Sequence, residues 1–216
     1  MRRGYIKRDI CIDVMTEEEM IEVLERLSER LNYVDFKAES RPGRIRVIFY
    51  GPKDLIRDAM AEAYEIARAV RGMMYPDSNG LYAYSIREVV SLVRGVAIPL
   101  NLLVYSLRFK GFEAYLDRGY VKTNAKLEDV MSAAASISDV YEEMKFTNAT
   151  PMCKRLIALY STVMDINIVE AIADLEDMKL IRRDGEEGPY ILSMEFNQAI
   201  AKLKEMVGEG HEDPDN

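Results

Sequence analysis

A group of cations around one predicted turn has the side-chain chemistry needed to bind phosphate. Arg41, Arg44 and Arg46 surround the dipeptide Pro42-Gly43, which is typical of a tight turn between two strands, and Lys37 lies on the first of those strands. Each guanidinium presents a planar fork of N–H donors that can contact one phosphate through two hydrogen bonds. These residues therefore predict a weak binding site for single-stranded nucleic acid.

The strand after the turn also determines what surrounds these cations. Side-chain alternation places four residues on one face of it: Arg44, Arg46, Ile48 and Tyr50. Apolar and aromatic side chains beside cations are typical of sheets on which bases stack. Nearby carboxylates leave an alternative open, a solvated face on which the cations are balanced by Asp9, Asp35 and Glu39.

A second charged group lies on a predicted helix between residues 168 and 178. Four apolar residues form its predicted buried stripe: Ile168, Val169, Ile172 and Leu175. The outward faces then carry carboxylates: Glu170, Asp174, Glu176 and Asp177. We expect this acidic face, and Glu170, Asp174 and Asp177 in particular, to bind a basic protein surface, because complementary charge speeds encounter and filters partners. The alternative is a solvated acidic helix without a partner.

Residue types that often perform catalysis are scarce. The only histidine, His211, lies in the acidic C-terminal segment, and the two cysteines, Cys11 and Cys153, are far apart in the sequence. Their spacing matches no metal-binding motif, and the phosphate-binding Gly-rich loop and the Gly-x-Ser-x-Gly motif are absent. Both cysteines are expected to be buried and to behave as small hydrophobic side chains. The sequence predicts no catalytic residue, no metal and no cofactor.

Composition and charge place the chain among folded proteins and limit its partners. Of its 216 residues, 49% are hydrophobic and 31% are charged, which is ordinary for a globular protein. Residues 1–75 carry 14 basic and 14 acidic residues, whereas residues 150–216 carry 7 basic and 14 acidic ones. The net charge of −8 therefore belongs mainly to the last third of the chain, where it opposes contact with phosphates.

The sequence also bears on location. The most apolar stretch, Val96 to Val104, is too short to span a bilayer. The basic residues 1–4 are followed by a strand-like segment rather than by the apolar core of a signal peptide. We therefore expect no membrane segment, no export signal and a cytoplasmic protein.

Residues 1–71 predict a β-α-β-β-α domain. Residues 5–14 alternate between apolar and polar types, as in a half-buried strand. Thr16 and Glu19 match a capping box, in which each side chain accepts a hydrogen bond from the backbone N–H of the other. A helix follows, then a hairpin from segments 34–39 and 44–50, and a second helix over about residues 54–70.

Residues 72–80 end in Pro76-Asp77-Ser78-Asn79-Gly80 and predict a linker. Residues 81–146 then repeat the αββα order, with strands at 112–117 and 120–123 on either side of Arg118-Gly119. Ser85 and Glu88 predict another capping box. The return of the same pattern after about 75 residues predicts an internal duplication.

Residues 147–207 predict a third domain of different texture. A helix begins at Thr150-Pro151, and Asp165 is expected to cap the helix that follows. Segments 180–184 and 190–193 predict two short strands joined by a Gly-rich turn, before a last helix from 195 to about 207. Residues 208–216 are acidic and are expected to form a disordered tail.

This C-terminal pattern resembles a winged helix of the transcription-regulator type. The resemblance covers roughly residues 139–207 and is carried by the helix 168–178, Leu180-Ile181-Arg182-Arg183, the glycine-containing turn and Tyr190. The family implies a helix in the major groove of DNA. Carboxylates on that helix and at Glu186-Glu187 would face the phosphates, so we expect this winged helix to bind protein instead.

The middle segment resembles a KH RNA-binding domain in its order of elements. That family implies a Gly-x-x-Gly loop between its first two helices, whereas Arg94-Gly95-Val96-Ala97-Ile98 contains one glycine. The backbone clamp for RNA is therefore incomplete.

The element order, the helix opening Thr150-Pro151-x-x-Lys154-Arg155-Leu156 and the wing-like end together resemble an uncharacterised archaeal protein family. That resemblance implies a cytoplasmic prokaryotic protein and adds no binding residue. We interpret the chain as an α+β protein, with tandem αββα units followed by a winged-helix-like domain, that acts as a non-enzymatic adaptor in a nucleic-acid-associated or other macromolecular complex. Two alternatives stay open: a winged-helix transcription regulator, and an enzyme with a small-molecule cleft between the αββα units.

Overall fold

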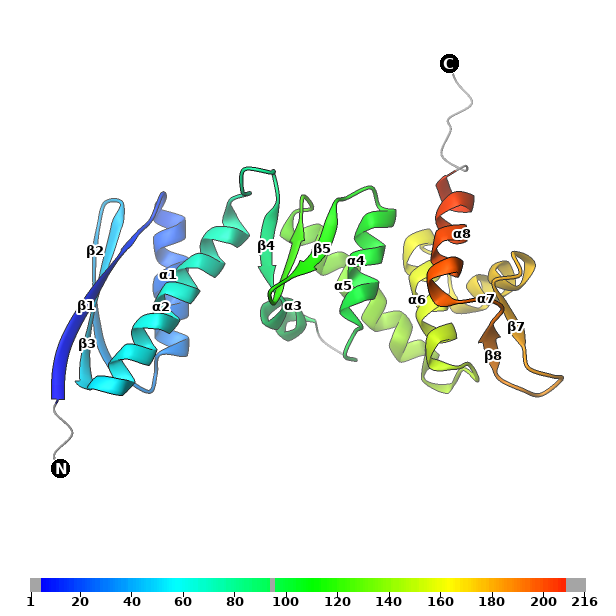
Figure 1. Ribbon diagram of the computed structural model, residues 1–216, viewed down its shortest axis with the longest axis horizontal. Coiled ribbons are helices and arrows are strands. Elements are labelled where there is room, and N and C mark those ends of the chain that lie inside the picture. Colours follow the sequence, from blue (N-terminus) through cyan, green and yellow to red (C-terminus); the bar gives the residue numbers. More distant parts are fainter. Residues whose placement is uncertain (1–4, 94–95, 209–216) are drawn as a thin grey trace, which may run out of the picture. The chain divides into compact units, whose positions relative to one another are not determined.

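The computed structural model describes residues 5–93 and 96–208 (Figure 1). Helices alternate with small sheets, so the α+β class predicted from the sequence is confirmed. The chain divides into two compact units, Met1–Tyr84 and Ser85–Asn216. The segment predicted as a separate C-terminal domain lies within the second unit.

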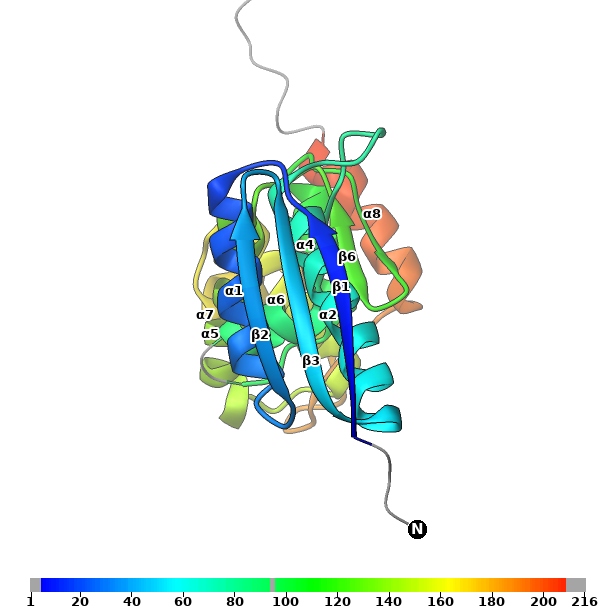
Figure 2. The same ribbon diagram turned by 90° about the vertical axis from the view of Figure 1, so that its left-hand side faces the viewer.

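The first unit is built on a three-stranded antiparallel sheet. β1 (Tyr5–Asp13) and β2 (Asp35–Arg41) both pair with β3 (Arg44–Pro52), which gives the order β1-β3-β2. α1 (Glu17–Arg30) and α2 (Lys53–Met74) lie on one face of this sheet, behind the strands in Figure 2. β1 and β2 are therefore the two edge strands, and β1 is the edge beside α2.

The strand register determines which side chains enter the core of this unit. Ile10 and Ile12 of β1 are buried, and they lie opposite Val47 and Ile45 of β3. The β2–β3 turn needs Gly43, because its φ of 77° suits the third position of a type II turn after Pro42. The alternation predicted for β1 and the hairpin is confirmed, except that Ile48, on the same face of β3 as Arg44 and Arg46, is also buried.

The end of α2 lies beyond the predicted helix. α2 continues to Met74, so it includes the first three residues of the segment predicted as a linker. Gly72 is inside the helix, where an added Cβ would lie 3.0 Å from the Cβ of Ala83. Its glycine is therefore explained by close packing rather than by a chain break.

The second unit begins with a similar arrangement. β4 (Tyr82–Ser85), at the division between the units, forms a sheet with β5 (Ala114–Asp117) and β6 (Tyr120–Thr123) in the order β4-β6-β5. α3 (Ile86–Leu92), α4 (Leu100–Phe109) and α5 (Leu127–Glu143) belong to the same segment. In both sheets the third strand lies between the first and the second. This order is what an internal duplication predicts, while superposition of the units stays a prediction.

The remaining elements form the C-terminal module. η1 (Met144–Phe146) leads to α6 (Pro151–Met164) and α7 (Ile168–Asp177). β7 (Ile181–Arg183) and β8 (Tyr190–Leu192) then form a hairpin, and α8 (Phe196–Gly208) follows. In the described ranges no single helix is both long and apolar enough to cross a membrane, and α6 and α7 meet that criterion only as a pair bent by 107°.

Three predicted helix caps differ from the structure. The Thr16 hydroxyl accepts the N–H of Glu19 as predicted, but the Glu19 carboxylate accepts the N–H of Met15 rather than that of Thr16. Ser85 precedes α3 without a side-chain cap.

The third cap concerns α7. Asp165 ends α6 in a left-handed conformation with a φ of 54°, and Asn167 caps α7 by accepting the N–H of Glu170 at 3.0 Å. A cap side chain reaches the N–H three residues ahead of it, and Asp165 lies two residues too early for that contact.

Candidate functional site

The outer face of the first sheet carries the predicted cationic cluster. Arg44 pairs across the strands with both Asp13 and Arg41, while Arg46 lies opposite Cys11 and Glu39. Lys37 lies opposite Ile48 on the same face. The structure therefore brings Lys37, Arg41, Arg44 and Arg46 together, as the alternation predicted.

Ion pairs occupy most of this positive charge. The Arg44 Nε donates to Asp13 at 2.7 Å, and the Arg46 Nε donates to Asp9 at 2.9 Å. These hydrogen bonds raise the pKa of both arginines. Lys37 donates to Glu39 at 2.9 Å, which raises the pKa of Lys37 and lowers that of Glu39.

The geometry favours the alternative of a balanced, solvated face. Among the four cations of the cluster, Arg41 has no ion pair to a described residue, and it lines a hollow of about 300 Å³ with Arg44 and Arg46. The single-strand site stays a prediction, with Arg41 as its available donor. Cys11 lines the same hollow and is exposed, which corrects its predicted burial. It lies at an outward position of β1, whereas Cys153 is buried inside α6 as predicted.

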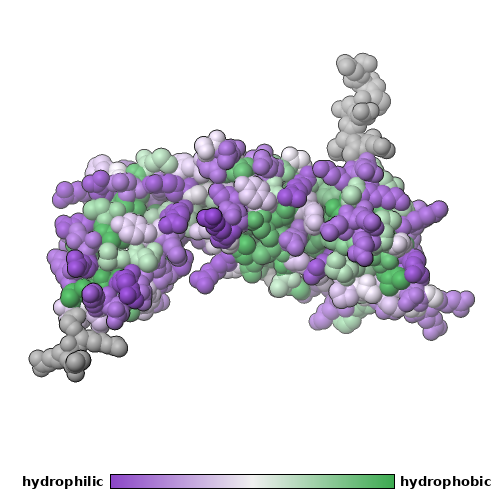
Figure 3. Space-filling view, viewed as in Figure 1, coloured by the Kyte–Doolittle hydropathy of each residue, from purple (hydrophilic) through white to green (hydrophobic). Residues whose placement is uncertain are grey.

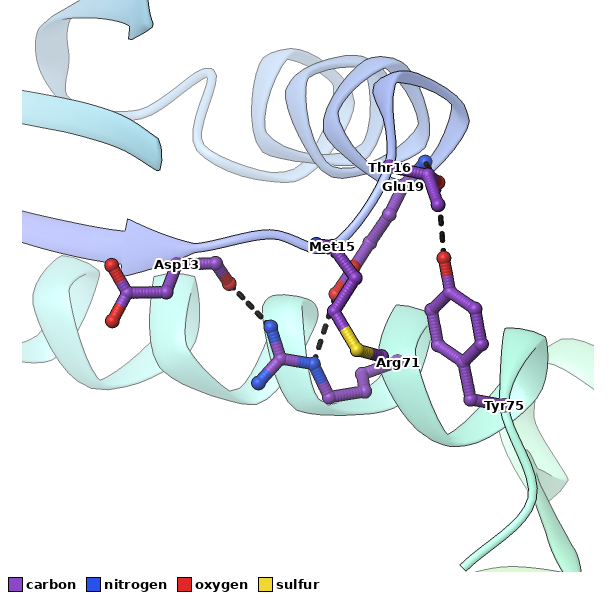
Figure 4. Close-up of polar contacts among 6 residues, drawn as sticks. All are labelled: Asp13, Met15, Thr16, Glu19, Arg71 and Tyr75. Carbon is purple, nitrogen blue, oxygen red and sulfur yellow. Dashed lines mark hydrogen bonds and ion pairs between the residues drawn. The ribbon is translucent and has the colours of Figure 1, made fainter. Parts of the chain in front are cut away.

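A carboxylate that the sequence indicated only as part of a helix cap is buried where β1, α1 and α2 meet (Figure 4). Glu19 is 1% exposed and accepts hydrogen bonds from the Met15 N–H at 2.6 Å and the Arg71 Nε at 3.0 Å. Arg71 also donates to the backbone carbonyl of Asp13. The hydroxyls of Thr16 and Tyr75 share a hydrogen bond at 3.0 Å. This network ties the end of β1 to both helices.

A groove runs between the free edge of β1 and α2. Its volume is about 620 Å³, and its lining includes Cys11, Ile12 and Asp13 from β1 and Tyr64, Arg68 and Arg71 from α2. The polar network of Figure 4 borders this groove, because Arg71 and Asp13 belong to both. No motif in the sequence signals this groove, since it arises from the position of an edge strand beside a helix.

The predicted acidic face of α7 is present, with two differences. Glu170, Glu176 and Asp177 are exposed, whereas Asp174 is half-buried and accepts a hydrogen bond from the Tyr160 hydroxyl at 3.0 Å. Val169 is 78% exposed, which corrects its predicted place in the buried stripe.

Helix geometry explains the position of Val169. The fully buried residues of α7 are Ala171 and Leu175, and a residue two positions before Ala171 lies on the opposite side of the helix. Val169 is thus an apolar side chain among exposed carboxylates.

The β7–β8 hairpin offers few available cations. Arg183 donates to the backbone carbonyl of Glu186 at 3.0 Å, and its guanidinium lies 5.1 Å from the ring centroid of Tyr190. Arg182 is exposed, but so are Glu186 and Glu187 in the following turn. The hairpin tip is therefore not strongly basic.

The protein surface also has an exposed apolar area. Figure 3 shows a largely hydrophilic surface with an apolar area on the second unit, in the region where Figure 1 places α3 and β5. The exposed hydrophobic side chains of these elements include Val90 and Leu116.

The raised pKa values of one cysteine and two tyrosines have structural causes. Burial raises the pKa of the Cys153 thiol to about 12. Burial and hydrogen bonds to carboxylates raise the pKa of Tyr33, beside Glu62, and of Tyr160, beside Asp174, to about 12 each. Each shift suppresses ionisation near neutral pH.

The prediction that no metal binds, and several others, concern residues that the structure describes only in part. Within residues 5–93 and 96–208, no group of three or more His, Cys, Asp and Glu side chains could hold a metal ion. The described residues do not include residues 1–4, Arg94 and Gly95 of the KH-like loop, or residues 209–216 of the predicted tail, which contain His211.

Fold and surfaces define an α+β protein of small sheets backed by helices, with charged surfaces and a groove at one sheet edge. The chain belongs to an archaeal family: the family model described as "Uncharacterized protein conserved in archaea (DUF2067)" matches residues 12–201. This match confirms the resemblance to an archaeal family. No curated protein and no solved structure matches the chain.

Proposed function

We propose that this protein is a non-enzymatic adaptor of the archaeal cytoplasm whose winged-helix-like C-terminal module binds a basic protein surface. The observation that carries the proposal is the exposed face of α7. Val169 is 78% exposed there, and Glu176 lies two helical turns further along the same side. Glu170 and Asp177 both lie on one side of this line.

An apolar side chain among carboxylates has the composition of a protein contact. Apolar centres and polar rims are typical of protein interfaces, and rim charges select partners of opposite sign. A duplex DNA reader instead needs Arg, Lys, Asn or Gln at base edges and cations at phosphates. Near α7 the side chains of this kind are Asn167 and Lys179, which lie at opposite ends of the helix. The Asn167 side-chain oxygen already caps the helix.

A transcription regulator is the second candidate, because the local geometry favours a winged helix. α6 and α7 meet at 107°, close to the angle of about 90–120° in helix-turn-helix motifs. Ala149 bridges to Tyr190 of β8, which adds a short third strand position to the hairpin. The charge on α7 separates the two candidates.

Photo-crosslinking from position 169 tests the proposal. The full chain would carry benzoylphenylalanine in place of Val169, and cross-links would be identified in archaeal lysate. We expect adducts with proteins whose cross-linked segments are rich in Lys and Arg. The matched control adds Glu176→Lys and Asp177→Lys, which should remove those adducts without lowering the melting temperature.

Two results would overturn the proposal. Adducts that persist after charge reversal would show that the acidic face does not select the partner. Adducts with DNA would favour the transcription regulator.

A further inference from the structure

The first unit has the strand arrangement of a split β-α-β-β-α-β fold without its last strand. In that fold, the strand that follows the second helix pairs with the free side of the first strand. Here the next strand, β4, pairs with β6 of another sheet. The position beside β1, next to α2, is therefore not filled by the strand that follows α2 (Figure 2).

Hydrogen bonds at the end of β1 show which backbone groups face this position. The Val14 N–H donates toward the hairpin, to the carbonyl of Gly43, whereas the Asp13 carbonyl accepts from Arg71 on the α2 side. Successive residues of a strand direct their backbone groups to opposite sides. The N–H and C=O groups of Lys7, Asp9 and Cys11 therefore face outward, and no described backbone group pairs with them.

The groove lies where an added strand would place its inward side chains. In an added strand, alternate side chains point to the same side of the sheet as α2. The 620 Å³ groove has Ala61, Tyr64 and Ala67 of α2 in its lining, so small and apolar surface is available there. Strand addition has two parts: main-chain hydrogen bonds, here along β1, provide affinity, and side-chain packing, here in the groove, provides specificity.

The charges that remain free around this edge are mainly positive. Asp9 and Asp13 are held by arginines of β3, whereas Lys7, Arg8 and Arg68 have no ion pair to a described residue. Glu65 is the groove carboxylate without such a pair. Arg8 is exposed although it lies at an inward-facing position of an edge strand, where a charge opposes strand pairing unless the added strand supplies the opposite charge. The edge therefore suits a segment that carries carboxylates.

A second copy of β1 does not meet these requirements. Antiparallel self-pairing places one residue opposite its own copy at the two-fold axis. An axis at Lys7, Arg8 or Asp9 opposes like charges, which is destabilising. An axis at Cys11 opposes Asp9 to Asp13, which is again a pair of like charges. An axis at Ile10 places Ile12 of the copy opposite Arg8, so the copy offers no carboxylate to that arginine.

We propose that the free edge of β1 binds an extended segment of another protein, which adds to the sheet as a fourth strand. Its inward side chains are apolar over α2 and acidic beside Arg8 and Arg68. This surface is separate from α7, so the proposal stands or falls independently of the proposed function.

A random twelve-residue peptide display library, panned against the full chain, tests the proposal. We expect enriched peptides in which Val, Ile or Phe alternate with Asp or Glu. Cys11→Pro removes one outward N–H without touching the β1–β3 ladder, so it should weaken binding of a synthetic enriched peptide at least about tenfold. Ser40→Pro is the matched control. The backbone N–H of Ser40 also points away from β3, but it lies on β2, the opposite edge of the sheet.

A second variant keeps the test decisive if Cys11→Pro lowers the melting temperature. Arg8→Glu with Arg68→Glu alters two residues without described ion pairs, and it should weaken the acidic peptide about tenfold or more. Enrichment of basic peptides, no enrichment, or equal binding by the Cys11→Pro and Ser40→Pro variants would overturn the proposal. A dimer in light scattering that Cys11→Pro dissociates would also overturn it, in favour of a second copy.

Discussion

Replacing Arg71 by methionine removes the side chain that joins β1 to the buried carboxylate of Glu19. Methionine keeps much of the aliphatic volume on α2 but donates no hydrogen bond. The change leaves Glu19, 1% exposed, with the Met15 N–H as its remaining described donor. It also leaves the carbonyl of Asp13 without the Arg71 contact.

The expected cost follows from this geometry. One hydrogen bond to a charged group contributes about 1.5–3 kcal/mol, and breaking a fully buried ion pair costs about 3–5 kcal/mol. The Arg71 side chain is 46% exposed, so water replaces part of what is lost and the larger figure must be discounted. We expect the free energy of unfolding of the first unit to fall by about 2 kcal/mol.

Amide hydrogen exchange measures this loss within the first unit. The buried β3 amides of Ile45 and Val47 should exchange roughly 30-fold faster in the variant, because about 1.4 kcal/mol corresponds to a tenfold change. Arg68→Met, one turn earlier on α2, is the matched control and should change exchange less than about twofold. Adding Glu19→Gln to Arg71→Met should recover part of the loss, because the buried charge is then absent.

Equal exchange rates in the Arg71→Met and Arg68→Met variants would show that the network of Figure 4 does not stabilise the unit.

Three further predictions concern single residues. A disulfide reagent should label Cys11 at once and Cys153 only after unfolding, because burial raises the pKa of Cys153 to about 12; labelling of both in the native protein would contradict this. Tyr160 has a folded-state pKa of about 12 against an ordinary 10.0, so its stabilisation is complete below pH 10 and is lost as the pH rises toward 12. Over that pH interval the free energy of unfolding should therefore fall more steeply in the wild type than in Tyr160→Phe, by up to about 1.4 kcal/mol per pKa unit. Parallel curves of unfolding free energy against pH would contradict the raised pKa of Tyr160. Arg118→Asn should stabilise the β5–β6 turn by about 0.5–1 kcal/mol, because Arg118 has a φ of 46° before Gly119 at 88°; an unchanged melting temperature would argue against strain there.

Local pattern was sufficient to predict most of the elements. Alternation in residues 5–14 and 44–50 predicted both strands of β1–β3 and the shared face of Arg44 and Arg46, because a strand has a period of two and only one face could be apolar. Turn chemistry at Pro42-Gly43 and Arg118-Gly119 located the hairpins, since few residues accept a positive φ.

Two kinds of feature were harder to predict from the sequence: the exact start and facing of a helix, and contacts between residues far apart in the chain. A shift of two residues decides whether Asp165 or Asn167 caps α7, and apolar type alone did not show that Val169 points away from Ala171. Glu19 and Arg71 are 52 positions apart, so only the packing of α2 against β1 and α1 reveals their contact. The groove beside β1 depends on a strand that pairs elsewhere, which no local motif encodes.

Titration of the full chain against random and genomic DNA duplexes at low salt distinguishes a protein-binding adaptor from a DNA-binding regulator. Electrostatic binding is strongest under those conditions, so a weak cationic contact would be detected. The acidic face of α7 predicts no saturable binding at micromolar protein concentration. Sequence-selective, sub-micromolar binding that is lost in Asn167→Ala or Lys179→Ala would contradict the adaptor and establish a DNA-binding regulator.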